Sequence, residues 1–117
     1  MRGTRKRTRK TGPTRLSKVR LDNLVEQATV DCYNESEQVT GLSAMIEDNV
    51  ALPFETAVLG VTVTVERVQL TPQGEIVAVC RRAGVRQIIP LLDLPLPSPP
   101  PAGAEWIEAY RHWLGAG

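Results

Sequence analysis

The spacing of apolar residues changes at Phe54, and this change constrains the fold more than any other feature of the sequence. In the run TAVLGVTVTVERVQL, Val61, Val63 and Val65 alternate with polar residues. Alternation with period two and many β-branched side chains is typical of a half-buried strand. Two more strand-like runs, EIVAVCRR and VRQIIPLLDL, follow the turn signals TPQG and AG. The region up to Leu94 is therefore predicted to be an antiparallel meander.

Two apolar stripes at helical spacing precede these strands, and Pro53 prevents the second from continuing. Asn34 followed by Glu37 has the capping-box pattern that starts a new helix. We therefore expect two helices with a break near residues 32–34, and one continuous helix is the alternative. The stripes consist of Leu21, Leu24, Val25 and Ala28, then of Val39, Leu42, Met45 and Ile46.

The C-terminal part combines a proline-rich segment with a short helical pattern. Residues 95–103, PLPSPPPAG, contain five prolines and no periodic pattern, which is typical of a stiff, extended connector. Trp106, Tyr110 and Trp113 then follow at i, i+4 and i+7, one stripe of a helix. Docking of this helix on the core is a simpler use of the three aromatic rings than a binding platform.

These patterns predict an α+β fold in one domain. Three or four short strands are too few for a sandwich, so the meander must curl into a small barrel or be covered by helices. We expect both: an N-terminal helical segment, a meander that curls into a small SH3-like barrel, and a short C-terminal helix. At 117 residues the chain has room for a single core.

Charge divides the chain into a basic tail and an acidic body. The first twenty residues contain nine lysines and arginines and no acid, whereas residues 21–117 contain five arginines and thirteen acids, a balance of −8. Residues 1–18 have almost no apolar side chains, so we predict a disordered tail there and a folded domain at 19–117. Such a tail suits the phosphate backbone of nucleic acids, and a solubilising or self-associating arm is the alternative.

Several functional classes are excluded or disfavoured. No apolar stretch follows the basic residues as in a signal peptide, and no segment approaches the roughly twenty apolar residues of a membrane span. Cys32, Cys80 and His112 are too few for a four-ligand zinc site, and the two cysteines are expected to be ordinary buried thiols. Motifs of common catalytic sites are absent from the sequence. We expect a cytoplasmic protein that is not an enzyme and makes no membrane contact.

Six acids and no basic residue fall between residues 31 and 55. Oxygen-rich clusters of this kind suit Ca²⁺, which takes six to eight oxygen ligands. An EF-hand is excluded, because Ser36 stands where glycine is required and Leu42 where glutamate is required. On a continuous helix, Asp31 and Glu35 would extend the core-facing stripe, where a carboxylate needs a partner. Water, an arginine from elsewhere in the fold and a metal cation remain as alternatives.

The run VDCYNESEQVTGLSAMIEDNVALPFETAV resembles the cyanobacterial calcium-binding protein family. That family has a VDAYG-like start, then EEQ, a small residue, LE with a second acid, and PF with an alanine shortly after. The ending with two tryptophans is similar to its Trp-rich terminal helix, and the resemblance covers about residues 22–94 and this ending. The matching residues are Val30, Asp31, Glu37, Gln38, Ile46, Glu47, Asp48, Pro53, Phe54 and Ala57.

The resemblance implies a small protein with a barrel-like sheet that binds Ca²⁺ and acts as an intracellular buffer or sensor. It implies Asp31, Glu37, Glu47 and Asp48 as ligands, and Glu35 is added from the helix argument alone. The basic arm is not part of the family pattern, and Ser36 replaces an acid. The alternative function is a small interaction module whose N-terminal arm binds nucleic acid. The sequence leaves the oligomeric state open.

Overall fold

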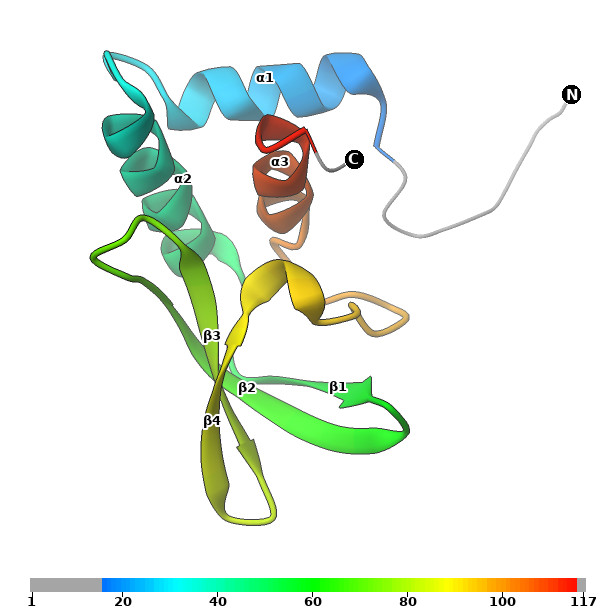
Figure 1. Cartoon of the computed structure of the whole chain (residues 1–117). Coiled ribbons are helices and arrows are strands. Elements are labelled where there is room, and N and C mark those ends of the chain that lie inside the picture. Colours follow the sequence, from blue (N-terminus) through cyan, green and yellow to red (C-terminus); the bar gives the residue numbers. More distant parts are fainter. Residues whose placement is uncertain (1–15, 116–117) are drawn as a thin grey trace, which may run out of the picture.

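A computed structural model describes residues 16–115, which form an α+β fold of three α-helices and one four-stranded antiparallel sheet (Figure 1). Residues 1–15 of the predicted tail lie outside the described part. The sheet lies on one side of the helices, and α1 runs across the ends of α2 and α3 (Figure 1). The elements are α1 (Lys18–Ala28), α2 (Glu35–Asn49), β1 (Phe54–Val58), β2 (Val61–Leu70), β3 (Ile76–Arg82), β4 (Val85–Pro90), the 3-10 turn η1 (Leu91–Asp93) and α3 (Glu105–Trp113).

The predicted break between two N-terminal helices is confirmed. Asn34 is the N-cap of α2, and its side chain accepts a hydrogen bond from the backbone N–H of Glu37. The first helix begins earlier than predicted, because the hydroxyl of Ser17 caps it by accepting from the backbone N–H of Arg20 at 3.0 Å. Leu16 already packs against the core. The folded domain thus includes residues 16–18, which the sequence assigned to the tail.

The predicted meander is confirmed, since the strands pair in the order β1-β2-β3-β4. The predicted SH3-like barrel is wrong: within the described residues β1 and β4 are the two edges of an open sheet. Other elements cover the concave face that a closed barrel would have sealed. Leu42 and Ile46 of α2 lie in one core with this face, and the hydroxyl of Thr56 donates to the carbonyl of Pro95 across it.

The C-terminal helix docks on the core, as its aromatic stripe predicts. Trp106 and Tyr110 are buried, and the hydroxyl of Tyr110 accepts from the backbone N–H of Ile76 at 3.5 Å. Trp113 is partly buried and donates through Nε1 to the side-chain oxygen of Gln38 at 2.9 Å. The aromatic side chains therefore join α3 to both the sheet and α2. Of the two cysteines, Cys80 is buried as expected, whereas Cys32 is only partly buried.

A side-chain pair also joins α3 to α1. Nε2 of His112 lies 2.7 Å from Oδ1 of Asp22, and the ammonium of Lys18 lies 2.8 Å from the other carboxylate oxygen. Hydrogen bonds from Lys18 and then His112 lower the pKa of Asp22. Between residues 16 and 115, no helix has the length and apolar character needed to cross a membrane.

Candidate cation site

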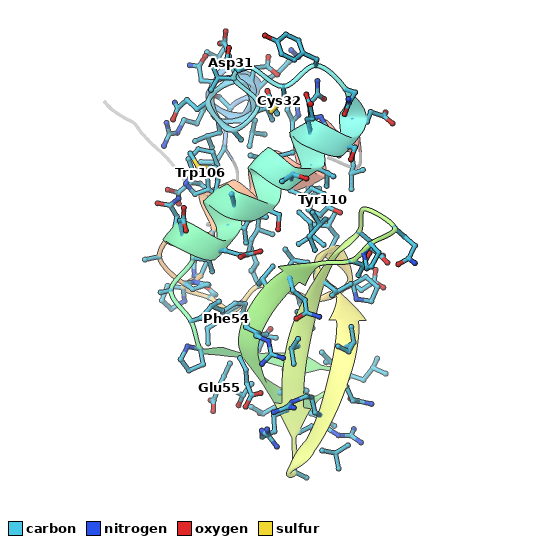
Figure 2. The ribbon with its side chains drawn as sticks, turned by 90° about the vertical axis from the view of Figure 1, so that its left-hand side faces the viewer. Asp31, Cys32, Phe54, Glu55, Trp106 and Tyr110 are labelled. Carbon is cyan, nitrogen blue, oxygen red and sulfur yellow. The ribbon has the colours of Figure 1, made fainter. Side chains whose placement is uncertain are left out.

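The five predicted ligands fall into two groups at opposite ends of α2. Asp31 lies in the turn before this helix, at the top of Figure 2, and Glu35 and Glu37 occupy its first turn. Glu47 and Asp48 occupy the last turn. With a rise of about 1.5 Å per residue, the ten residues from Glu37 to Glu47 span roughly 15 Å. One ion therefore cannot contact both groups in this structure.

The N-terminal group of carboxylates takes part in local folding. Oδ1 of Asn34 accepts from the backbone N–H of Glu37 at 2.8 Å, and Oε1 of Glu37 accepts from the backbone N–H of Tyr33 at 2.6 Å. This pair is a variant of the capping box, in which Glu37 accepts from the residue before the N-cap instead of from the N-cap itself. Glu35 lies at the positive end of the helix dipole, where a carboxylate is favourable. Folding alone therefore accounts for the positions of Glu35 and Glu37.

Asp31 differs from the sequence expectation. It has φ of 62° in the turn between α1 and α2, and its side chain is exposed. The continuous-helix alternative, which placed Asp31 and Glu35 together on the core-facing stripe, is therefore wrong. An exposed carboxylate in a turn can be hydrated and needs no buried partner.

Replacing Asn34 by alanine is expected to lower the free energy of unfolding by about 1 kcal/mol, because a backbone N–H at the start of α2 loses its acceptor. Urea denaturation followed by circular dichroism measures this change. Asn23→Ala, an exposed position inside α1, serves as the matched control and should change stability by less than about 0.5 kcal/mol. Equal effects of the two substitutions would contradict the capping role of Asn34.

The C-terminal group lies in a less favourable electrostatic environment. The side chains of Glu47 and Asp48 are exposed in the last turn of α2, and this turn contains no basic residue. The carbonyl groups at a helix C-terminus carry partial negative charge, so two carboxylates there repel the helix end as well as each other. Both carboxylates lack the capping roles found at the other end of the helix, and their exposed side chains are open to water or to a dissolved cation.

Ser43 fixes one of these two carboxylates. Its buried hydroxyl donates to Oε2 of Glu47 at 3.0 Å, one helical turn away. The second oxygen, Oε1, has no hydrogen-bond partner within the described residues. Ser43 was not among the residues predicted from the sequence, although its i, i+4 spacing to Glu47 could have indicated this contact.

Arginines do not neutralise either group within residues 16–115. Arg81 and Arg86 pair with Glu66, and Arg111 pairs with Glu108. None of the ion pairs among the described residues includes one of the five predicted ligands. Of the three alternatives for the acidic stretch, pairing with a described arginine is therefore not realised.

The described residues also lack a preformed cluster of side-chain metal ligands. No group of three or more histidine, cysteine, aspartate or glutamate side chains between residues 16 and 115 is arranged to hold a metal ion. A cation at either end of α2 would therefore need backbone carbonyl oxygens and water in addition to carboxylates.

Comparisons of the chain with known protein families, curated proteins and solved structures find no match.

Proposed function

We propose that the protein binds Ca²⁺ at a non-EF-hand site and acts in the cytoplasm as a calcium buffer or sensor rather than as an enzyme. The observation that carries this proposal is the pair Glu47 and Asp48 at the negative end of α2. No basic residue stands in that turn, and no ion pair of the described residues includes either carboxylate. The sequence resemblance to a calcium-binding family supports the same cation.

The chemistry at this end of α2 suits a hard cation. The last carbonyl groups of a helix have no hydrogen-bond partner inside the helix. Here the carbonyl of Ile46 is an exception, because it accepts a hydrogen bond from the backbone N–H of Val50. Free carbonyls, the Glu47 and Asp48 carboxylates and water supply oxygen ligands only, which Ca²⁺ prefers. The hydrogen bond from Ser43 holds Glu47 in place before an ion arrives. Only two charged ligands take part, so we expect weak binding, with a Kd of about 10⁻⁴–10⁻³ M.

Asp31, Glu35 and Glu37 are the second candidate position. Glu37 has one oxygen occupied by the N–H of Tyr33, and Glu35 is stabilised by the helix dipole. An ion at this end would compete with interactions that already stabilise α2. We therefore place the main site at Glu47 and Asp48 and expect a smaller contribution from the other three carboxylates.

Isothermal titration calorimetry of the full chain with CaCl₂ in near-physiological salt tests the proposal. We expect binding heat, and at ten times the Kd a stabilisation of about 1.4 kcal/mol by mass action. The double variant Glu47→Gln with Asp48→Asn should lose most of the affinity. The charge-matched control Glu26→Gln with Glu75→Gln, at exposed positions outside both groups, should retain it.

A third variant separates the two ends of α2. Asp31→Asn with Glu35→Gln leaves the capping carboxylate of Glu37 intact and should reduce calcium binding by less than threefold. Loss of binding in this variant and not in the first would move the site to the start of α2. Absence of heat and of any shift in Tm at millimolar calcium would sink the proposed function.

A further inference from the structure

Basic residues gather in only two parts of the chain. Nine of the fourteen lie in the first twenty residues, and four of the remaining five lie on the sheet. Only Arg111, on α3, lies elsewhere. The arginines of the sheet are Arg67 on β2, Arg81 and Arg82 on β3, and Arg86 on β4.

Strand register places three of these arginines on one face. Arg81 pairs directly with Arg86, and Arg67 pairs with Val79, two residues from Arg81 on the same strand. Directly paired residues and residues two apart share a face. The alternate residues of β3, such as Ala78, belong to the core beneath the helices. Arg67, Arg81 and Arg86 therefore lie on the sheet face turned away from that core, which we call the outer face.

One carboxylate lies among these guanidinium groups. Nε of Arg81 lies 2.8 Å from Glu66 Oε2, and Nε of Arg86 lies 3.8 Å from Oε1. A hydrogen bond from Arg81 and the charges of Arg86 and Arg67 lower the pKa of Glu66. A single carboxylate cannot neutralise three guanidinium groups. The cluster keeps positive charge, and Arg67 has no carboxylate partner within residues 16–115.

The spacing of the cluster suits a chain of phosphates. Neighbouring strands lie about 4.8 Å apart and residues along a strand about 3.3 Å apart, so the Cα atoms of the three arginines fall within roughly 12 Å. Guanidinium groups bind phosphate oxygens through paired N–H donors. Thr64 lies on the same face, opposite Arg81, and a threonine hydroxyl is a further donor to phosphate. Glu55, opposite Thr64 on edge strand β1, bounds the face with negative charge.

The outer face carries no aromatic side chain among its described residues. All five aromatic residues lie elsewhere: Phe54 pairs with Val65, which belongs to the core, Tyr33 precedes α2, and the others are on α3. Bases therefore have no ring on which to stack. Contacts from this face would be made to the backbone, which carries no sequence information.

We propose that the outer face of the sheet, with Arg67, Arg81 and Arg86, binds the phosphate backbone of nucleic acid without sequence preference. This binding surface is separate from the carboxylates of α2.

Fluorescence anisotropy of the full chain with a labelled 20-nucleotide RNA and a DNA duplex of equal length tests this surface. Arg67→Gln and Arg86→Gln should each weaken binding about threefold to fivefold in 0.1 M salt. Each should also make the negative slope of log association constant against log salt concentration shallower by about 0.7–0.9. Both variants leave the 2.8 Å pair of Arg81 with Glu66 intact. Arg111→Gln removes the same charge from α3 and should change the affinity less than twofold.

A second prediction changes the charge in the opposite direction. Glu55→Gln should tighten nucleic-acid binding, because it removes a carboxylate from the border of the outer face, whereas Glu26→Gln on α1 should not. Equal effects of Arg67→Gln, Arg86→Gln and Arg111→Gln would overturn the proposal. A change in sedimentation equilibrium caused by the sheet variants, without any effect on nucleic-acid binding, would also overturn it by assigning the face to a second copy of this chain.

Discussion

Replacing Gly103 by alanine is expected to lower the free energy of unfolding by about 3 kcal/mol. Gly103 has φ of 86°, and a Cβ there would overlap the backbone carbonyl of Asn49 and lie 2.8 Å from Cα of Val50. Left-handed backbone in a residue with a side chain and overpacking against rigid backbone each cost about 1–3 kcal/mol. Urea denaturation followed by circular dichroism measures the combined loss.

Gly84→Ala separates the two contributions. Gly84 has nearly the same backbone angle, φ of 81°, but a Cβ there would meet no atom within 4 Å. This control should therefore lose only the conformational part, about 1 kcal/mol. If both variants lose the same stability, the close approach of Gly103 to α2 contributes nothing and the expectation is wrong.

The position of Gly103 explains how the proline-rich segment supports the end of α2. The backbone N–H of Ala51, just after this helix, donates to the carbonyl of Ala102 at 2.8 Å. Gly103 follows directly and allows the segment to approach the last turn of the helix. The segment predicted to be a stiff connector thus also packs against the end of α2 and stabilises the turn that carries Glu47 and Asp48.

Local patterns made much of the fold predictable from sequence. Strand β2 shows period two because one of its faces packs against the core, as with Val63 and Val65. The start of α2 was predictable because the side chains of Asn34 and Glu37 accept hydrogen bonds from backbone N–H groups no more than four residues away along the chain. Both features depend on neighbours along the chain, which a sequence displays directly.

Features that depend on distant contacts were not predictable. Closure of the sheet depends on what covers its concave face, and here residues from α2 and a contact from Thr56 to Pro95 take that place. The candidate site was predicted as one group of acids, but the uninterrupted span of α2 separates Asp31, Glu35 and Glu37 from Glu47 and Asp48. Counting acids in a stretch therefore gives the charge of a site and not its shape.

Replacing Gly41 by alanine is expected to lower the free energy of unfolding by about 2 kcal/mol, although alanine is the better helix former. Gly41 lies inside α2, and a Cβ there would overlap the carbonyl oxygen of Ala28 and lie 3.2 Å from its carbonyl carbon. Helix propensity favours alanine over glycine by about 1 kcal/mol. Overpacking against the end of α1 should exceed this gain, because the blocking atoms belong to backbone, and an overlap this close is expected to cost about 3 kcal/mol.

Ala44→Gly in the same helix shows the propensity term alone. Ala44 is exposed three residues further along α2, so its replacement should destabilise by about 1 kcal/mol without any change in packing. Glycine is thus expected to be more stable at position 41 and alanine at position 44 of the same helix. Thermal and urea unfolding of both variants can measure this difference. A stabilising Gly41→Ala would mean that α1 can move away from α2 at little cost. The close contact between Gly41 and Ala28 would then not determine the position of α1 on the rest of the fold.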